Sequence, residues 1–494
     1  MHGRLARLLR TTAIYGLGGV LLRALGLILL PLFTSHLTPL DYGINAMLGW
    51  LTFVIWPLFS VGFGAALAPI YFAAPENARR GCIWTAATIL SGSALLLSVL
   101  APLLSGDLSA VILGGPEYTY LAILTLLSAS LSIATIPFTL FLQFQERAKT
   151  YVVISTLVAL MSTALSIWLV VRLGKGVQGL VEASALTQAV SFVMFGSTAL
   201  SLLGKYNFDA ELAKQLLKLG IPLIPSFLFL FVIQDGNKYI LQWMAGVQNL
   251  GVYAVGFNLG FAMNLFVSAF QTAWLPYFMS YSDKREEAAI LFGRVMTYYA
   301  FGFGALTLVF FIAAKPVVML LTQPPYFEAS EVVGLSAATQ ALFGAFYVLL
   351  PAIYFANHVR YVGLIQALAA LVSVGVNLGL ISLFGLAGAA LALALGALAL
   401  VLFTYVWNRI RDRNYLVVRY EWRRLGLFSA VFATYATIAM WHRTLSLGAE
   451  VLLSSALTIS LPFLIYRLLM VDERKRIWSM ARELVRVTSR TEGR

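Results

Sequence analysis

Residues 386–408 read LAGAALALALGALALVLFTYVWN and hold no charged side chain in 23 positions. A helix of about 20 apolar residues crosses the roughly 30 Å hydrocarbon core of a bilayer. Similar stretches recur along the whole chain, without the alternating ten-residue pattern of barrel strands. Because backbone groups in lipid must satisfy each other's hydrogen bonds, helices are the remaining solution. We therefore expect an all-α membrane protein.

The composition agrees with a chain whose surface faces lipid. Of its 494 residues, 60% are hydrophobic and only 11% are charged, whereas a soluble protein carries about 25% charged residues. The single cysteine, Cys82, excludes an intrachain disulfide, and the four histidines lack metal-ligand spacing. The sequence also lacks a phosphate-binding glycine loop and a nucleophile triad. We expect no cofactor, no metal, no catalytic residue and no enzyme activity.

The apolar stretches divide the chain into about 14 predicted transmembrane helices. The external loops between them are short, which excludes a substantial extracellular domain. The predicted spans are residues 11–33, 44–72, 83–104, 118–141, 152–172, 177–203, 221–244, 250–278, 290–313, 332–356, 361–383, 386–408, 425–441 and 449–470.

Lysine and arginine set the orientation of these spans. With both termini in the cytoplasm, 28 of the 34 basic residues fall in cytoplasmic segments, as the positive-inside rule requires. Four lie on the outer side, and two, Arg23 and Lys238, lie within spans. The net charge of +13 is therefore explained by the basic residues of the cytoplasmic segments, and we expect no nucleic-acid partner.

Four short motifs occur twice in the same order, with nearly the same separation each time. A common offset across four pairs indicates an internal repeat. The pairs are Leu40-Asp41-Tyr42-Gly43-Ile44 with Asn249-Leu250-Gly251-Val252-Tyr253 (208 residues apart), Pro69-Ile70-Tyr71-Phe72 with Pro276-Tyr277-Phe278-Met279 (207), Gly176-Val177-Gln178-Gly179 with Gly385-Leu386-Ala387-Gly388 (209), and Arg147-Ala148-Lys149-Thr150 with His358-Val359-Arg360-Tyr361 (211).

Each copy of the repeat holds six spans, so both copies insert in the same direction. The expected fold is two parallel six-helix bundles, related by an axis along the membrane normal, plus two C-terminal helices. Repeats of this kind place a binding site at their interface. The expected divisions are an N-terminal bundle at 1–203, a cytoplasmic linker helix at 204–220, a C-terminal bundle at 221–410, two additional transmembrane helices at 411–470 and a basic amphipathic cytoplasmic tail at 471–494.

Three parts of the chain carry motifs that occur together in one transporter family. They are Gly26-Leu27-Ile28-Leu29-Leu30-Pro31-Leu32-Phe33-Thr34 followed by Leu37-Thr38-Pro39-Leu40-Asp41-Tyr42-Gly43, then Gln145-Glu146-Arg147-Ala148, then Asn377 followed by Gly385-Leu386-Ala387-Gly388-Ala389-Ala390. At these residues the chain resembles the polysaccharide flippases of the multidrug/oligosaccharidyl-lipid/polysaccharide exporter superfamily. The resemblance covers roughly residues 8–410.

The resemblance implies a flippase that acts by alternating access in a bacterial inner membrane. Its substrate is expected to be an undecaprenyl-pyrophosphate-linked oligosaccharide, such as an O-antigen, capsule or exopolysaccharide unit. The partners it implies are this lipid-linked oligosaccharide and membrane lipids, together with polysaccharide polymerase and chain-length proteins.

One position departs from the family pattern. The family often carries Asp-Arg in span seven, before a glycine that begins the next loop. Counting back from Gly246, these positions are Asn237 and Lys238. The cation is kept as lysine, but the acid is replaced by an amide, and Asp235 stands two residues earlier.

Two cations within predicted spans are the candidate ligands of the substrate diphosphate. Arg23 lies about 12 residues into span one, roughly 18 Å deep at 1.5 Å per residue. Charges in a span are costly and face a wet interior or each other, and a guanidinium fork suits a diphosphate. The alternatives are an interhelical ion pair for Arg23, and neutralisation by Asp235 or snorkelling to the interface for Lys238.

Five further polar residues complete the predicted site. Asp235 shares a helix face with the lysine three residues later, and we expect it to be a counter-ion or a proton or sodium site. Glu182, about five residues into span six, is a second ion-coupling candidate, with interfacial solvation as the alternative. The residues expected to bind sugar hydroxyls, or else to join helices, are Asn258, Asn264 and Gln271.

Other functions stay open at this point. A drug or cation exporter of the same superfamily would need acidic residues in its cavity. A flippase for a peptidoglycan precursor, a membrane glycosyltransferase or polymerase, and a non-transporting membrane subunit of a polysaccharide synthase are the further alternatives. The sequence does not determine the glycan, the driving ion or the oligomeric state.

Overall fold

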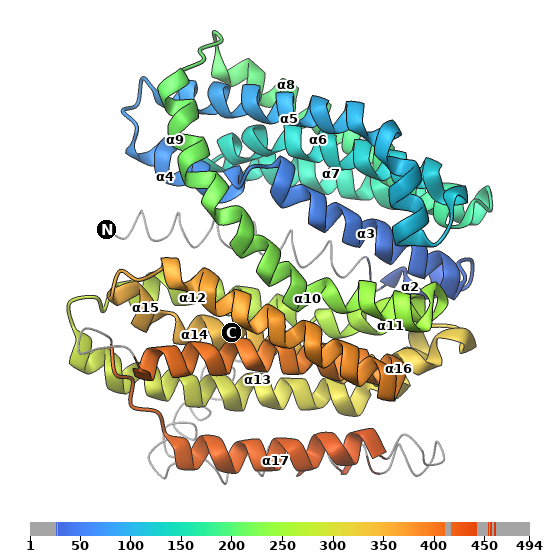
Figure 1. Ribbon diagram of the computed structural model, residues 1–494, viewed down its shortest axis with the longest axis vertical. Helices are drawn as coiled ribbons and strands as arrows, with labels where there is room; N and C mark the ends of the chain where they lie inside the picture. The colour runs from blue at the N-terminus through green and yellow to red at the C-terminus, as the bar shows by residue number, and fades with distance from the viewer. Residues whose placement is uncertain are drawn as a thin grey trace, which may run out of the picture.

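The computed structural model describes residue 26, residues 28–410 and 416–441, and five residues between 453 and 460. Within this part of the chain every regular element is a helix (Figure 1). Nine of these helices are long and apolar enough to cross a membrane, and the bent pair α11–α12 is a tenth candidate. The all-α membrane fold is therefore confirmed. Predicted spans one and fourteen lie largely outside the described residues.

The helices form two lobes that are connected by α9 (Figure 1). The first lobe contains α3 (Pro39–Phe59), α4 (Phe63–Ala73), α5 (Arg79–Leu108), α6 (Thr119–Phe144), α7 (Ala148–Ile167) and α8 (Gly176–Leu203), and is followed by α9 (Ala210–Gly220). The second lobe contains α10 (Ile224–Ala245), α11 (Val247–Phe261), α12 (Asn264–Met279), α13 (Arg285–Leu321), α14 (Ser330–Leu349), α15 (Pro351–Phe355), α16 (Arg360–Ile410) and α17 (Trp422–Trp441). The short helix α2 (Leu30–Thr34) packs against α13 of the second lobe.

The long element α16 consists of two helices that run antiparallel. Its 51 residues are more than two spans require, and Gly385 breaks it with φ 53° and ψ −122°. A Cβ on Gly388 would overlap the carbonyl oxygen of Leu380, and the rings of Tyr361 and Trp407 lie 4.9 Å apart. The chain therefore reverses at Gly385, and α16 supplies both predicted spans eleven and twelve.

The two lobes meet where α3 crosses α11, and two glycines allow a close crossing. A Cβ on Gly251 would overlap the carbonyl oxygen of Pro39, and a Cβ on Gly43 would overlap that of Val247. Pro39 and Val247 are 208 residues apart, as the two glycines are, so the contact is reciprocal. Reciprocity of this kind arises at a two-fold axis. The predicted repeat is therefore confirmed at this crossing.

A second matched pair of glycines also occupies equivalent places. Gly176 (φ 56°) precedes the last helix of the first lobe, and Gly385 (φ 53°) precedes the last antiparallel helix of α16. Both lie in the left-handed region that glycine adopts without steric cost. Each glycine therefore makes the tight reversal that returns the chain into its lobe.

The motif around Asp41 forms the first turn of α3. Thr38 Oγ1 accepts a hydrogen bond from the Asp41 N–H at 3.2 Å, and Asp41 Oδ2 accepts one from the Thr38 N–H at 2.8 Å. This capping box, with Pro39 in the first turn, begins the helix. The helix therefore begins at Pro39, five residues before the predicted start of span two, because hydropathy does not register a cap. Asp41 Oδ1 also accepts from the Val177 N–H at 3.2 Å, which ties α3 to α8.

The linker helix α9 is fixed to the break between α3 and α4. Asp209 caps it by accepting from the N–H groups of Glu211 and Leu212. A Cβ on Gly62 would overlap the carbonyl oxygen of Gly220 at the end of α9. This contact holds the start of α10 against the first lobe.

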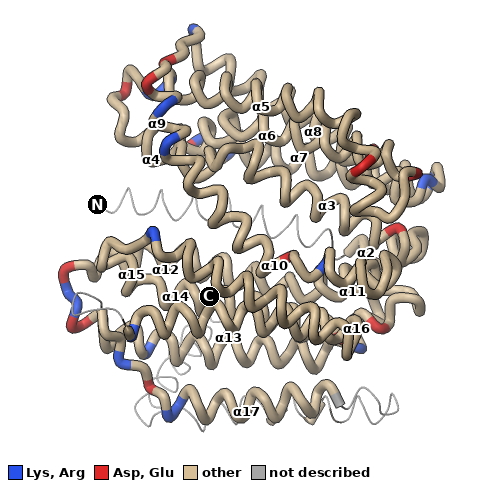
Figure 2. The backbone as a smooth tube through the Cα atoms, viewed as in Figure 1, with Lys and Arg blue, Asp and Glu red and all other residues tan. Residues whose placement is uncertain are grey.

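The charges identify the two ends of the molecule. Lysine and arginine gather at the ends of the lobes near α4, α9, α15 and the start of α17 (Figure 2), which is the end predicted to face the cytoplasm. The crossing of α3 with α11 lies at the opposite, predicted outer end, and from there the ribbons of the lobes diverge toward α4 and α12 (Figure 1).

The glycine crossing predicts a selective loss of stability. Gly251→Ala should lower the free energy of unfolding by about 1–3 kcal/mol, because its methyl group has no room beside Pro39. Gly375→Ala is the matched control, since nothing lies within 4 Å of a Cβ there. The melting temperatures of the purified proteins in detergent measure the difference. Equal temperatures for the two variants would contradict the close crossing.

Candidate functional site

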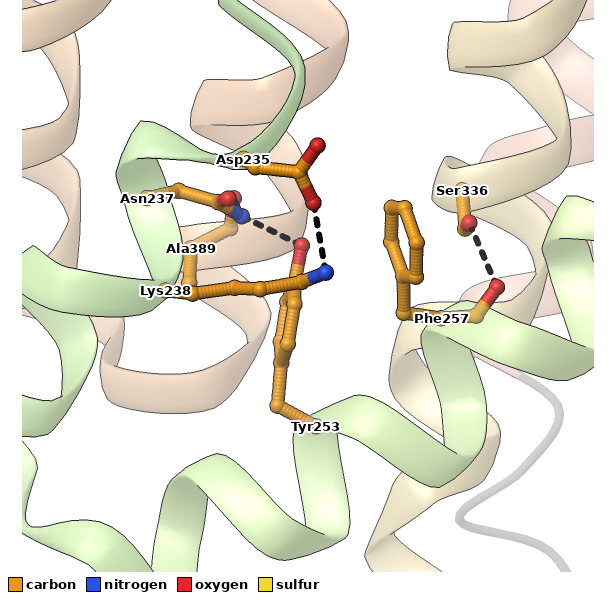
Figure 3. A network of polar contacts seen from close by, with 7 residues as sticks. All are labelled: Asp235, Asn237, Lys238, Tyr253, Phe257, Ser336 and Ala389. Atoms are coloured by element: carbon orange, nitrogen blue, oxygen red, sulfur yellow. Dashed lines mark hydrogen bonds and ion pairs between the residues drawn. The ribbon is translucent and has the colours of Figure 1, made fainter. Parts of the chain in front are cut away.

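Asp235 and Lys238 lie near the middle of α10, the helix that enters the second lobe from the linker, and they form an ion pair (Figure 3). Lys238 Nζ lies 2.5 Å from Asp235 Oδ1, and the two side chains are 12% and 13% exposed. The same nitrogen lies 4.4 Å from the ring centroid of Phe257 on α11, at cation–π distance. The lysine charge is thus shared between a carboxylate and an aromatic face, while both side chains keep some access to solvent.

Asn237, at the position where the family often carries an acid, connects three helices. It is 1% exposed, and its Nδ2 donates to the Tyr253 hydroxyl of α11 and, at 3.5 Å, to the Ala389 carbonyl of α16 (Figure 3). Its Oδ1 is buried without a hydrogen-bond partner in the described residues. A neutral amide therefore occupies the acid's place and joins α10, α11 and α16.

The structure brings two of the predicted site residues into contact. Asp235 is the counter-ion of Lys238, which is the self-neutralised arrangement that the sequence left as an alternative to substrate binding. The substrate-binding role of Lys238 and the ion-coupling role of Asp235 stay predictions. Arg23 lies outside the described residues, so its predicted contact with a diphosphate also stays a prediction.

The polar residues of predicted span eight have different surroundings. From Leu250 to Gly260, Asn258 is the one exposed residue of α11. Asn264 Nδ2 donates to the buried Gln340 Oε1 of α14 at 3.2 Å, which joins two helices of the second lobe. Gln271 is half-buried on α12. Asn258 is therefore the residue of this group that a ligand can reach most easily.

Glu182 lies near the predicted outer end of α8 and has a basic partner. Its Oε2 lies 2.6 Å from Lys175 Nζ, and its Oε1 accepts from Gln178 Nε2 at 2.7 Å. The carboxylate is 15% exposed and the lysine 36%. The ion pair is at the end of the helix, where partial hydration keeps its contribution to stability small.

A neutral polar pocket lies within the first lobe, between α3, α6 and α8. Its volume is about 270 Å³ and no charged residue lines it. The sequence carries a signal for this pocket, because Ser128 and Ser132 are four residues apart and therefore share one face of α6. The polar residues that line the pocket are Asn45, Thr52, Thr125, Ser128, Ser132, Ser184 and Gln188.

Two like-oriented helical lobes, with an ion pair on the helix that enters the second lobe from the linker, have the design of a membrane transporter. Solved structures share this fold. An inward-facing multidrug resistance MATE family transporter of the MOP superfamily aligns with a TM-score of 0.66 at 13% identity, over 85% of this chain and 96% of that one. The lipid II flippase MurJ, in an inward closed conformation, aligns with a TM-score of 0.64 at 14% identity, over 92% of this chain and 99% of that one. A MOP superfamily transporter from Pyrococcus furiosus, reported with a binding pocket of reverse polarity, aligns with a TM-score of 0.51 at 14% identity, over 81% of this chain and 95% of that one.

The sequence assigns the family directly. The profile of the polysaccharide biosynthesis protein family matches residues 8–282, more than half of the chain. The protein belongs to this family and is a multi-pass membrane protein with a MOP superfamily fold. A search of curated proteins found no match.

The ion pair on α10 predicts energetic coupling between its members. Asp235→Asn or Lys238→Gln alone should each leave a poorly hydrated charge without its partner, so each should destabilise more than the double variant does. We expect a coupling energy of about 1–3 kcal/mol in a double-mutant cycle, measured by chemical or thermal unfolding in detergent. Additive effects of the two substitutions would show that Lys238 is neutralised elsewhere.

Proposed function

We propose that this protein is a flippase that exports an undecaprenyl-pyrophosphate-linked oligosaccharide across a bacterial inner membrane by alternating access. The observation that carries the proposal is the place of Lys238, a cation inside the membrane on the inter-lobe helix of a polysaccharide biosynthesis protein. A cation there matches an anionic cargo. The exported unit would then pass to a polysaccharide polymerase and chain-length proteins.

In the proposed mechanism the diphosphate competes with Asp235 for Lys238. The lobes are in close contact at the α3–α11 crossing, at the predicted outer end, and the substrate would load from the predicted cytoplasmic side. A phosphate oxygen approaching Nζ would replace the Asp235 carboxylate, with Arg23 as a second cation. Asn258 and Gln271 would contact sugar hydroxyls, while the lipid tail stays in the bilayer.

The two bundles, 1–203 and 221–410, would rock against each other, with 204–220 as their connection. The two helices of 411–470 and the basic tail of 471–494 would anchor the second bundle at the membrane. A negative cell interior favours outward movement of an anion by roughly 2.3 kcal/mol per charge for each 100 mV. In this mechanism the membrane potential would drive the loaded step without ion coupling, and ion antiport through Asp235 is the competing mechanism.

A cation or drug exporter of the same fold is the principal alternative. It fits less well, because the pocket of the first lobe has no acidic lining residue and Asp235 is already occupied by Lys238. A non-transporting subunit of a polysaccharide synthase would not need a charged pair inside the membrane.

Transport of a defined lipid-linked oligosaccharide in proteoliposomes tests the proposal. Lys238→Ala should reduce the flipping rate at least about tenfold, because a charge-assisted phosphate contact is lost. Lys218→Gln, an exposed lysine of α9, is the matched control and should flip at the wild-type rate. Wild-type protein that does not flip the substrate, or a Lys238→Ala variant that flips it normally, would contradict the proposal.

The driving force has its own test. If Asp235 binds a coupling proton or sodium ion, Asp235→Asn should remove the pH or sodium dependence of flipping. Dependence on membrane potential alone, unchanged in this variant, would assign Asp235 to charge compensation and exclude ion antiport through it. The flipping rate is measured at fixed potential while pH and sodium are varied separately.

A further inference from the structure

A polar pocket lies at the predicted cytoplasmic end of the first lobe, away from the charged pair on α10. It has a volume of about 630 Å³ and is formed by the end of α4, the start of α5 and the end of α6, within the size range of small-molecule sites. The residues that line it are Tyr71, Phe72, Glu76, Asn77, Arg79, Arg80, Phe144, Gln145 and Glu146. Gln145 and Glu146 belong to the Gln-Glu-Arg-Ala motif, to which the proposed mechanism gives no role.

The motif shapes one wall of this pocket. Gln145 Nε2 donates to the Tyr71 hydroxyl at 3.0 Å, which fastens the end of α6 to α4. Glu146 has φ 54°, an uncommon conformation for a residue other than glycine. Three rings pack beside it: Phe144 lies 4.7 Å from Tyr71 and 5.2 Å from Phe72, between ring centroids. The wall is thus aromatic and held in place, and Phe72 is exposed.

The arginines of this pocket have free hydrogen-bond donors. Arg79 Nε donates to the Ala74 carbonyl at 3.3 Å, and its guanidinium lies 5.7 Å from the Tyr71 ring centroid. Within the described residues the terminal nitrogens of Arg79 have no hydrogen-bond partner, and Arg80 forms no ion pair. A guanidinium oriented through Nε and a ring presents its outer edge as a two-pronged donor, which matches a phosphoryl group.

The second lobe has an arginine at the equivalent position, and this arginine has a hydrogen-bond partner on its terminal nitrogen. Arg285 is the repeat counterpart of Arg79, 206 residues later, and Phe355 is that of Phe144, 211 residues later. Arg285 Nη2 donates to the Phe355 carbonyl at 3.1 Å, directly across the two helix ends. The first lobe has the same framework but leaves the arginine edge facing a pocket.

From these observations we propose that this pocket binds the phosphoryl headgroup of a lipid in the cytoplasmic leaflet. Arg79 and Arg80 would bind the phosphate oxygens. Glu76 and Asn77 would accept hydrogen bonds from the group attached to the phosphate, either an amine or sugar hydroxyls. The exposed Phe72 would lie against the upper part of the lipid chain. Two sources share this chemistry: a resident phosphatidylethanolamine, or the sugar-bearing diphosphate of the proposed substrate before it reaches α10.

Lipid retention by the full chain tests the site without any transport assay. The purified protein is mixed with phosphatidylethanolamine, phosphatidylglycerol or undecaprenyl diphosphate, and bound lipids are counted by native mass spectrometry. Arg79→Gln with Arg80→Gln should weaken retention of the favoured lipid at least about tenfold. The control, Lys214→Gln with Lys218→Gln, removes two exposed charges from α9 on the same end of the molecule and should retain that lipid as the wild type does.

Glu76→Gln provides a second variant that keeps both arginines. If the resident phosphatidylethanolamine is the ligand, this variant should lower the preference for phosphatidylethanolamine over phosphatidylglycerol. If undecaprenyl diphosphate is the ligand, the preference between these two lipids should stay unchanged. Equal retention by the wild type and the arginine variant would overturn the proposal, as would an equal loss in the α9 control. A protein that retains the lipid at this site but flips no oligosaccharide would keep the pocket and refute only the proposed function.

Discussion

The arrangement of this protein depends on the close approach of two helix backbones at Gly43 and Gly251. Helices can come this near only where a Cβ is missing, and here two repeat-equivalent glycines face each other's helix across one axis. In lipid the hydrophobic effect does not drive helices together, because the lipid tails are as apolar as the side chains. Close packing between small residues is therefore a principal source of helix association. The contact sets the axis, and the axis places α10 with its charged pair between two like-oriented halves.

Within the described residues, the two charges on α10 compensate each other. Lys238 is held by Asp235 and by the Phe257 ring, which reduces the cost of keeping a cation in a weakly polar region. Asn237 joins three helices without adding charge. The arginine pocket of the first lobe differs, because Arg79 and Arg80 lie at the start of α5, at the end of the lobe that is predicted to face the cytoplasm.

Much of the fold could be predicted from the sequence, because lipid imposes a one-dimensional rule: each crossing needs about 20 apolar residues. Predicted spans two to twelve match the described helices for this reason, and repeated glycines such as Gly176 and Gly385 marked the two copies. The site was harder to predict. The spacing of Asp235 and Lys238 predicted their ion pair, but hydropathy could not show that Asn264 pairs with Gln340. The sequence analysis used Arg79 and Arg80 only to orient the spans. The pocket beside them could not be predicted, because it is formed by the ends of three helices that are separate in the sequence.

If the two bundles rock against each other as proposed, the close contact at the α3–α11 crossing should open during transport. Spin labels at Leu40→Cys and Asn249→Cys, in a Cys82→Ala background that removes the one native cysteine, report this distance by pulsed electron paramagnetic resonance in nanodiscs. The account predicts one short distance without substrate and an added longer population when lipid-linked oligosaccharide is supplied. A single distance that stays unchanged in protein that transports actively would contradict it.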